Sequence, residues 1–385
     1  MKIFVLGAGM MGRAVVYDLG GAREVQRIVV ADYDRGRAHE VARKFGRGKA
    51  RGALADVRDT SHLARLLRGS DVVINCTQFN WNLDVMRAAL VAHIDYMDLG
   101  GLYHMTRKQF ALDREFRRIG RIAIVGMGGA PGISNVMARA LCDPLDRINS
   151  IRVYNAGADL QRYDSPIAYT FSIATILDEL TTPPIAFQNG KYVEKPMLSD
   201  PEPGTYPAPI GKIVLRHSIH SELGTLPVSF ANKGVREVFF KINYEPQLVN
   251  LVRGLAHAGF TSREPIPVNG TRIAPRAVLL ALMQKHATKK TPLDVEALRV
   301  VVSGQQDGRR AAMAMEMWAD HSLRPQLSAV ARDTGFPAAI AAVMRGRGEI
   351  KGVGVEAPEN VVPPKPFFTE LKQRGFRFRR WNVRL

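Results

Sequence analysis

Cysteine is scarce in this sequence, and long apolar runs are absent from it. The 385 residues include two cysteines, Cys76 and Cys142, each at the end of a short apolar stretch. No zinc-type spacing occurs, so we interpret both as small buried thiols and predict no disulfide and no metal site. No run of 18 or more apolar residues is present, and the first strand pattern starts at residue 2 without a basic leader. We therefore expect a cytoplasmic protein with no membrane partner.

Acidic residues are few relative to basic ones. The chain has 54 Lys and Arg against 36 Asp and Glu, a formal charge of +18 at pH 7. Such an excess raises the question of a nucleic-acid partner. Most of it is scattered, and the one dense stretch is residues 374–381, where arginines alternate with aromatic residues. We interpret this stretch as an arm whose aromatic rings pack while its arginines stay in solvent, and nucleic-acid binding is the less favoured alternative.

A glycine motif is the strongest functional signal in the chain. An apolar stretch leads into the sequence G-A-G-M-M-G at residues 7–12, a helical pattern follows, and a second apolar stretch ends in an acidic residue twenty positions after the motif. This order is typical of a dinucleotide-binding strand–turn–helix unit, in which the glycines let the backbone approach a pyrophosphate at the helix N-terminus. The expected cofactor contacts are Gly7, Gly9, Met10, Met11, Gly12 and Asp32.

The acidic residue bears on which dinucleotide binds. A carboxylate at Asp32 would accept hydrogen bonds from ribose hydroxyls and repel a 2′-phosphate. We therefore predict NAD as the cofactor, with NADP as the alternative, because Arg35 is close enough in sequence to moderate the preference.

Strand and helix patterns alternate over the first 127 residues. This rhythm predicts an α/β fold with a Rossmann doubly wound parallel sheet, which binds ligands beyond the carboxyl ends of its strands. The length favours a second, mixed α/β substrate domain. We place the NAD(P)-binding domain at 1–130, completed by 335–385, and the substrate domain at 131–334. The strand candidates of the first sheet are residues 3–6, 28–32, 52–55, 72–76, 94–99 and 122–125.

The pattern changes to hairpins after about residue 147. Turn signals at Asn189-Gly190 and Asp307-Gly308 each join two β-type segments, which predicts antiparallel strands. Five prolines between Pro196 and Pro209 predict a loop. The segments expected here are strands at 151–154, 185–193, 298–302 and 311–317 and helices at 338–344 and 367–373.

Several separated segments together resemble one enzyme family. They are D-L-G-G at 98–101, G-G-A-P-G-I-S-N at 128–135 and H-S-E-L-G-T-L-P at 220–227. In this order they resemble the saccharopine dehydrogenase family, and the likeness covers nearly the whole chain. The resemblance implies a Rossmann domain, a smaller substrate domain and a C-terminal segment that returns to the first domain.

The C-terminal third resembles the lysine 6-dehydrogenases of that family most, at residues 272–280, 298–308 and 352–375. Saccharopine reductases often carry an acidic residue where this chain has Ala130, which favours the lysine type. The resemblance implies NAD-dependent oxidation of a carbon–nitrogen bond, foremost oxidative deamination of the lysine side chain. Saccharopine-type cleavage and a non-catalytic dinucleotide-binding sensor are the alternatives. We expect a small amino-acid substrate and a homo-oligomer.

Such chemistry needs a proton acceptor. A lysine side chain with a pKa of about 10.4 is protonated at pH 7, and its nitrogen must be neutral before a hydride leaves the adjacent carbon. We consider Asp98 and His104 after the fifth expected strand, and Glu222 and Tyr244 in the second domain. Each has a structural alternative: Asp98 as a turn or cap residue, His104 as a loop residue, and Glu222 as a first-turn residue.

Residues that follow other strands complete the expected site. The substrate carboxylate would favour an arginine, and Arg216 is the candidate because it lies just before the 220–227 segment. Cys76 has a packing role as its alternative. The further expected cofactor contacts, all placed just beyond strand ends, are Asp56, Cys76, Thr77 and Gly128.

Overall fold

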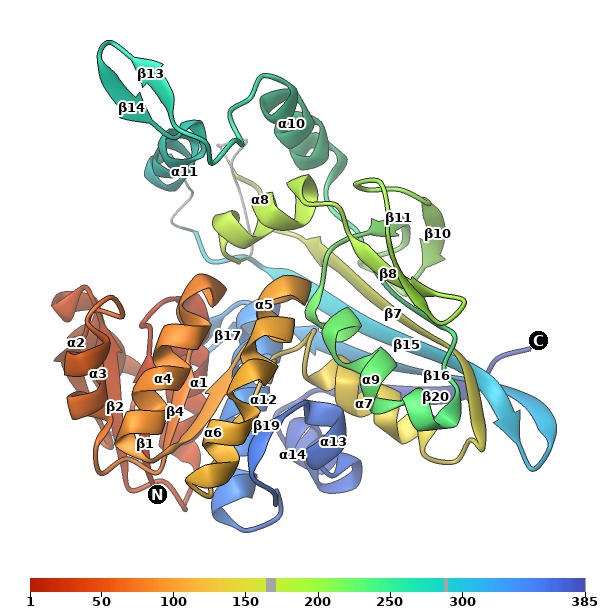
Figure 1. Ribbon diagram of the computed structural model, residues 1–385, viewed down its shortest axis with the longest axis horizontal. Helices are drawn as coiled ribbons and strands as arrows, with labels where there is room; N and C mark the ends of the chain where they lie inside the picture. The colour runs from red at the N-terminus through yellow and green to blue at the C-terminus, as the bar shows by residue number, and fades with distance from the viewer. Residues whose placement is uncertain (164–170, 287–289, 385) are drawn as a thin grey trace.

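Two sheets and the helices around them make up the fold (Figure 1). The computed structural model describes residues 1–163, 171–286 and 290–384. The first sheet has seven parallel strands in the order β19-β6-β5-β4-β1-β2-β3, which confirms the expected doubly wound parallel sheet. Its strands are β1 (Lys2–Leu6), β2 (Arg27–Asp32), β3 (Ala50–Leu54), β4 (Val72–Asn75), β5 (Asp95–Asp98), β6 (Ile122–Ile124) and β19 (Gly354–Glu356).

Helices cover both faces of this sheet, which explains why its central strands β1 and β4 are almost entirely apolar. In β1, Ile3 and Val5 pack into one core while Phe4 and Leu6 pack into the other. Successive side chains of a strand point to opposite faces, so a strand covered twice is apolar at every position. One face carries α1 (Met10–Gly21), α2 (Arg35–Phe45) and α12 (Ala329–Gly346), and the other carries α3 (Thr60–Leu67), α4 (Asn82–Ala92) and α6 (Asp113–Arg118).

The second sheet is mixed and has nine strands. Its main path runs β10-β11-β12-β7-β15-β16-β20, with β8 and β9 attached beside β12. Only the β12–β7 pair is parallel among its described pairings. α7 (Ile133–Cys142) packs on this sheet within the same core as α1 and α12, so one apolar core joins the two domains. The strands are β7 (Arg147–Asp159), β8 (Ile185–Gln188), β9 (Lys191–Glu194), β10 (Glu202–Thr205), β11 (Lys212–His217), β12 (Glu237–Ile242), β15 (Asp294–Gln306), β16 (Arg309–Asp320) and β20 (Arg377–Asn382).

Both expected hairpins are present. At the turns, Asn189, Gly190, Asp307 and Gly308 have φ values of 52°, 79°, 51° and 71°. Two successive positive φ values match the type I′ turn, whose twist suits two antiparallel strands. The proline-rich stretch 196–209 differs from the expectation of a loop, because it contains β10. β10 lies at the end of the sheet, where a proline needs no hydrogen-bonding partner strand on one side.

A small helical layer stands above the second sheet in Figure 1. Its helices share an apolar core that is separate from the main one. α8 lies nearest the sheet, and the β13–β14 hairpin projects farthest from it (Figure 1). The elements are α8 (Ile173–Thr181), α10 (Pro246–His257), β13 (Ile266–Val268), β14 (Thr271–Ile273) and α11 (Pro275–Lys285).

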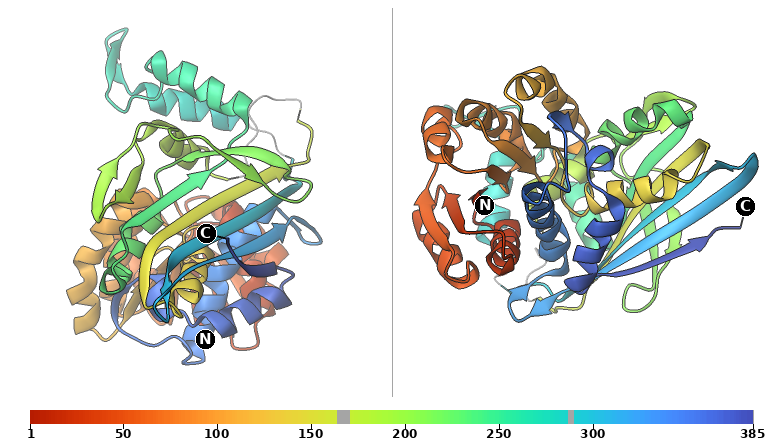
Figure 2. Two further views of the ribbon diagram at one scale, coloured as in Figure 1. Left: turned by 90° about the vertical axis from the view of Figure 1, so that its right-hand side faces the viewer. Right: turned by 90° about the horizontal axis from the view of Figure 1, so that it is seen from below.

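The C-terminal segment serves both sheets. β19 pairs with β6 of the first sheet, whereas β20 pairs with β16 of the second. Residues 335–385 therefore do not all return to the first domain, and Figure 2 shows the last strand along the edge of the second sheet. Along β20 the aromatic residues are half-buried and the arginines exposed, as a docked arm requires. The segment also contains α13 (Pro358–Val361) and α14 (Pro364–Gln373).

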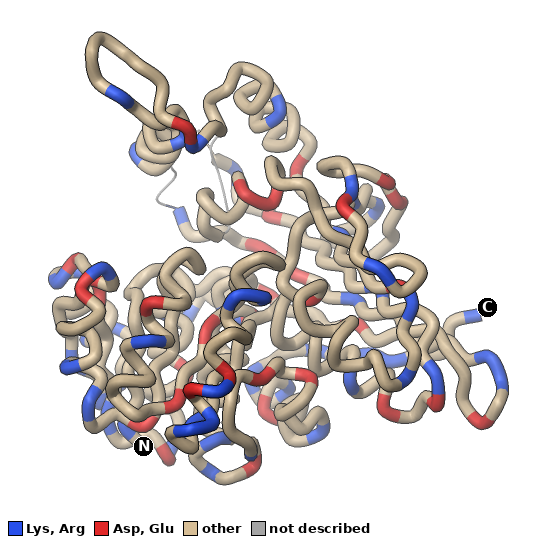
Figure 3. Tube along the Cα trace, in the orientation of Figure 1, with Lys and Arg blue, Asp and Glu red and all other residues tan. Residues whose placement is uncertain are grey.

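Helix α12 is longer than the expected helix at 338–344. It begins at Ala329 and contains Pro337, which the sequence pattern treats as a boundary. Packing extends it: a Cβ on Gly335 would lie 2.7 Å from the Ala14 Cβ, so α12 and α1 cross closely at this glycine. No helix of the described residues is long and apolar enough to cross a membrane. Figure 3 shows Lys and Arg spread over much of the chain rather than gathered in one block.

The remaining short elements lie in the connections. They are α5 (Leu102–Gln109), α9 (Leu226–Ser229), β17 (Ser322–Leu323), β18 (Gln326–Leu327) and the 3₁₀ helices η1 (Phe79–Trp81), η2 (Phe110–Leu112), η3 (Ser221–Gly224) and η4 (Ala231–Lys233).

Candidate active site

The glycine motif forms the turn between β1 and α1. Gly7 has φ +100°, and a Cβ there would lie 2.8 Å from the Cys76 carbonyl oxygen. A Cβ on Gly12 would lie 1.9 Å from the Gly7 carbonyl oxygen, so these two glycines let the loop close. A Cβ on Gly9 would meet nothing within 4 Å. Because α1 begins at Met10 with no side-chain cap and no acidic residue in its first turn, its N–H groups suit an anionic ligand.

Asp32 at the end of β2 holds this loop in place. Its carboxylate accepts hydrogen bonds from the backbone N–H groups of Ala8 (2.7 Å) and Asp34 (2.9 Å), and only 6% of the residue is exposed. The Arg37 guanidinium lies 3.8 Å from the same carboxylate, whereas Arg35 is exposed and forms no described contact with it. The arginine beside Asp32 is therefore Arg37, two positions beyond the residue that sequence reasoning selected.

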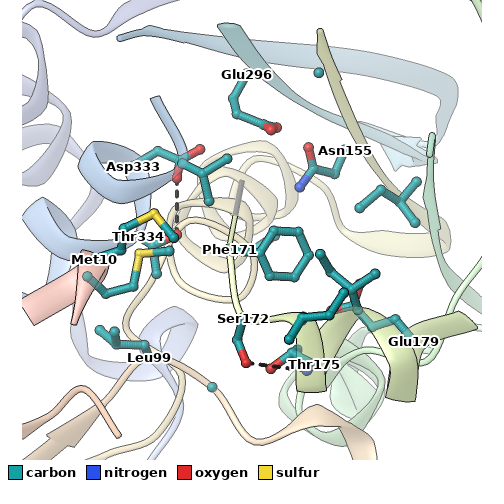
Figure 4. Close-up of a pocket in the computed structure, with 18 of the residues that line it drawn as sticks. Met10, Leu99, Asn155, Phe171, Ser172, Thr175, Glu179, Glu296, Asp333 and Thr334 are labelled. Carbon is teal, nitrogen blue, oxygen red and sulfur yellow. Dashed lines mark hydrogen bonds between the residues drawn. The ribbon is translucent and has the colours of Figure 1, made fainter. Parts of the chain in front are cut away.

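A cleft of about 810 Å³ lies beyond the carboxyl ends of the first sheet and reaches the second sheet. Four segments that follow strands of the first sheet line it, together with β7, β15, α8 and the first half of α12. Figure 4 shows Met10 and Leu99 on one side and Glu296, Asn155 and Glu179 across from them. Among the residues that the sequence predicted for the site, those that line the cleft are Gly9, Met10, Met11, Cys76, Thr77 and Tyr244.

Asp98 clamps two loops and does not line the cleft. Its carboxylate accepts hydrogen bonds from the Gly100 N–H (2.9 Å), the Gly126 N–H (2.8 Å), the Gln109 amide (2.5 Å) and the Tyr96 hydroxyl (2.9 Å). Only 1% of the residue is exposed. Burial raises the pKa of Asp98, and these hydrogen bonds partly oppose that effect. The loops after β5 and β6 are therefore fixed by Asp98, which is the turn role that the sequence left open.

Eight other expected site residues lie outside the cleft lining, namely Gly7, Gly12, Asp32, Glu222 and the four described next. His104 is exposed on α5 with its ring edge-on to Tyr103. Asp56 forms an ion pair with Arg58, whose hydrogen bonds lower the pKa of Asp56 to about 2. Gly128 is buried, and a Cβ there would lie 2.9 Å from the Leu99 carbonyl oxygen. Arg216, in β11, donates a hydrogen bond to the Leu198 carbonyl oxygen at 3.3 Å.

Glu179 and Tyr244 form a polar pair in the cleft wall. The Tyr244 hydroxyl donates to the Glu179 carboxylate, and both residues line the cleft. Glu179 is 5% exposed, and burial raises its pKa to about 7. A carboxyl group whose pKa lies near neutrality exchanges protons readily at physiological pH. Sequence reasoning missed Glu179 because it sits inside an amphipathic helix without a motif.

His220 lies in the same wall, with Glu222 behind it. The His220 Nδ1 atom pairs with the Glu222 carboxylate, which also accepts from the Ser134 hydroxyl at 2.7 Å. The His220 ring stacks on Phe240 with centroids 3.7 Å apart. Burial lowers the pKa of His220, but attraction to Glu222 and Glu179 outweighs it, and the pKa is raised overall. Glu222 is 0% exposed and does not line the cleft, and it contacts the cleft wall through His220.

The cleft has a strongly acidic lining. No Lys or Arg belongs to the described residues that line it. Coulomb attraction therefore favours a cationic ligand next to these side chains. The carboxylates in the lining are Asp159, Glu179, Glu245, Asp294, Glu296 and Asp333.

Comparisons with known proteins agree with this architecture. Residues 3–124 match the model of the saccharopine dehydrogenase NADP binding domain, and residues 128–376 match that of the saccharopine dehydrogenase C-terminal domain. Carboxyaminopropylagmatine dehydrogenase of Synechocystis is 24% identical over 387 residues, which cover 97% of this chain and 96% of that protein. Carboxynorspermidine synthase of Vibrio cholerae is 25% identical over 419 residues, which cover 100% and 97%.

A solved structure shares the fold over the full length. Saccharopine dehydrogenase (L-Glu forming) of Saccharomyces cerevisiae aligns with a TM-score of 0.75 at 19% identity and covers 100% of both chains. The Rossmann sheet, the glycine turn and the cleft define a nicotinamide-dinucleotide-dependent oxidoreductase. The chain belongs to the saccharopine dehydrogenase family, and it is an NAD(P)-dependent dehydrogenase that acts on CH–NH donors.

Proposed function

We propose that this enzyme interconverts a secondary amine with a primary amine and a carbonyl compound. In the oxidative direction the carbon beside the neutral nitrogen gives up a hydride, water supplies oxygen to that carbon, and the C–N bond breaks. The products are the carbonyl compound, the primary amine, the reduced dinucleotide and one proton. The relatives that match over almost their whole length are named for substituted agmatine and norspermidine, and these names favour an amine substrate over lysine itself.

The residues at the glycine turn fit a dinucleotide. The space above Gly9 is open, and the uncapped start of α1 suits a pyrophosphate. When bound, the cofactor accepts or donates the hydride. Cys76 and Thr77 follow β4, the neighbour of β1, and line the same side of the cleft. Beyond a strand end next to the glycine turn, they would contact the cofactor rather than the distal part of the substrate.

The acid–base wall is the observation that carries the proposal. Glu179 and Tyr244, with His220 backed by Glu222, face the same cleft as the glycine turn. An alkyl amine with a pKa near that of lysine, about 10.4, arrives protonated at neutral pH. Glu179, with a pKa of about 7, accepts the proton before the hydride departs. Attraction to His220 lowers the pKa of Glu179 and so opposes part of the effect of burial.

Oxidative deamination of lysine is the competing function. It is supported by the C-terminal resemblance to lysine 6-dehydrogenases. It requires a partner for the substrate carboxylate, and no Lys or Arg lines the cleft in the part of the chain that the structure describes. Arg216, the expected partner, lies elsewhere on β11. An amino-acid semialdehyde also carries a carboxylate, so the lining does not separate the two reactions, and the names of the two relatives are what favour the secondary amine.

The test runs both directions with purified enzyme. In the reductive direction, agmatine or a linear polyamine, an amino-acid semialdehyde and NADH or NADPH should yield a secondary amine, detected by mass spectrometry with one reduced dinucleotide consumed per product. In the oxidative direction, lysine, ornithine and saccharopine are compared. Release of ammonia from lysine would assign the competing function. If no amine is turned over in either direction, the result would favour the remaining alternative, a non-catalytic dinucleotide-binding sensor.

A further inference from the structure

Three carboxylates gather on the wall of the cleft that β15 and α12 form. Asp294 and Glu296 lie on β15, and Asp333 lies in the first half of α12. Figure 4 shows Glu296 and Asp333 at the cavity from two different elements. The acid–base wall with Glu179 lies apart from them in the same view. The proposed proton transfer at Glu179 uses none of these three carboxylates.

Two glycines make room for this group. A Cβ on Gly157, the β7 partner of Glu296, would lie 2.6 Å from the Glu296 Oε1 atom. A Cβ on Gly129 would lie 3.2 Å from the Asp333 carboxyl carbon. Any larger residue at position 157 would push the Glu296 carboxylate from its place. The backbone on both sides is therefore shaped around these acidic side chains.

The carboxylates have too few partners of their own. The Glu296 Oε2 atom is buried and accepts no hydrogen bond from the residues that the structure describes. Asp333 is 4% exposed, and its one described side-chain hydrogen bond comes from the neighbouring Thr334 hydroxyl at 3.1 Å. Asp294 is committed to the N–H groups of Ala329 and Val330 at the start of α12. Burial and mutual repulsion raise the pKa of Glu296, an unfavourable state that a cation would relieve.

We infer that Glu296 and Asp333, with Asp294 behind them, form a subsite for a second cationic group of the substrate, a terminal ammonium or guanidinium. This inference rests on the proposed function and adds the substrate class: an amine that carries a further cation at a distance from the reacting nitrogen. A metal ion fits less well, because no group of three His, Cys, Asp or Glu among the described residues is arranged to hold one. A substrate carboxylate at this position would be repelled.

Binding is measured by calorimetry on the full-length protein saturated with oxidised dinucleotide. The probes are the dications butane-1,4-diamine and agmatine, and the monocation n-butylamine serves as the reference. The two dications should bind at least about tenfold more tightly than n-butylamine, because a charge-assisted hydrogen bond is worth roughly that much. The E296Q and D333N variants should lose this preference. The control variant E194Q changes an exposed carboxylate on β9 and should keep it.

The comparison of the two dications assigns the terminal group, since preference for agmatine indicates a guanidinium subsite. Equal affinity for n-butylamine and the dications, or an unchanged preference in E296Q and D333N, would overturn the inference. Competition by Mg²⁺ that E296Q abolishes would also overturn it, in favour of a metal site. If the dications bind as expected but no amine is turned over, the proposed function fails and the subsite stands. If amines are turned over but the dications bind no more tightly than n-butylamine, the proposed function stands and the subsite inference fails.

Discussion

The two walls of the cleft present different chemistry to a ligand. The wall from the first domain presents backbone and small or neutral side chains, such as Gly9, Thr77 and Gly100, and none of its lining residues is charged. The wall from later parts of the chain, residues 155–334, contributes all six carboxylates of the lining. Backbone N–H groups suit a phosphate that is common to all dinucleotides, whereas side-chain charge distinguishes one substrate from another. Cofactor binding and substrate choice can therefore change separately.

The largest effect is expected on cofactor affinity, from a larger side chain at Gly9 in the first-domain wall. Gly9→Leu places a side chain in open space, so the fold should be kept while the dinucleotide is excluded. We expect affinity for NAD(P) to fall by about a hundredfold or more, near 2.8 kcal/mol, in a fluorescence titration. Gly12→Ala is the contrasting change, because its Cβ meets the Gly7 carbonyl and should lower the melting temperature. Normal cofactor affinity in Gly9→Leu would remove Gly9 from the cofactor site.

The second largest effect is expected on the rate of turnover, from a substitution of Glu179 in the wall that residues 155–334 form. Glu179→Gln removes the proton acceptor and should lower kcat by about a hundredfold at pH 7, within the usual range for a general base. In the wild type the carboxylate form grows as the pH rises through about 7, so oxidation should accelerate there. The variant should lack this step and keep only the rise that follows the amine itself. Wild-type activity in Glu179→Gln would place the proton acceptor elsewhere.

The same substitution has a signature in stability. The folded-state pKa of Glu179, about 7, lies above its usual value of 4.5. The native state therefore binds this proton more tightly than the unfolded chain, and the resulting stability is present below pH 4.5 and lost as the pH rises through 7. Glu179→Gln should flatten that part of the curve of melting temperature against pH. A curve parallel to that of the wild type would contradict the raised pKa.

A smaller effect on the rate of turnover is expected from a substitution of Glu222, which lies behind the cleft wall. Glu222→Gln weakens the partner of His220 without reaching the cleft. We expect kcat to fall by about tenfold with little change in KM, because a group that acts through another affects its orientation and charge. The pH at which oxidation accelerates should also shift. A loss of stability with an unchanged rate and pH profile would show that Glu222 only supports the fold.

The smallest effect concerns the choice between the two dinucleotides. Asp32 keeps its carboxylate on the glycine turn by accepting the Ala8 N–H, and NAD preference remains our prediction. Arg37→Ala removes the cation 3.8 Å from Asp32 and should weaken NADP use by about three- to tenfold while NAD use changes little. The ratio of kcat/KM values for the two cofactors measures this. An equal loss with both cofactors would show that Arg37 does not discriminate between them.

Local patterns predicted the parts of the fold that short-range chemistry controls. Six of the seven strands of the first sheet, the glycine turn and both hairpins follow from apolar runs, glycine positions and Asn-Gly or Asp-Gly pairs, whereas β19 was not among the expected strands. The pattern is ambiguous at strand ends. Cys76 follows β4 and Asp98 ends β5, yet the first lines the cleft and the second turns inward to clamp two loops. A strand-end position does not reveal which way its side chain points.

The sequence by itself therefore determined the family, the parallel sheet and the glycine turn where we expect the cofactor, because each shows in short motifs or local patterns. Only the tertiary structure decided the substrate wall. Asp159, Glu179, Glu296 and Asp333 are far apart in sequence, and they meet because β7, β15, α8 and α12 converge on one cleft. The start of α12 belongs to this wall, and the Asp294 carboxylate from β15 accepts hydrogen bonds from the first N–H groups of that helix. Long-range packing of this kind leaves no periodic signal in the sequence.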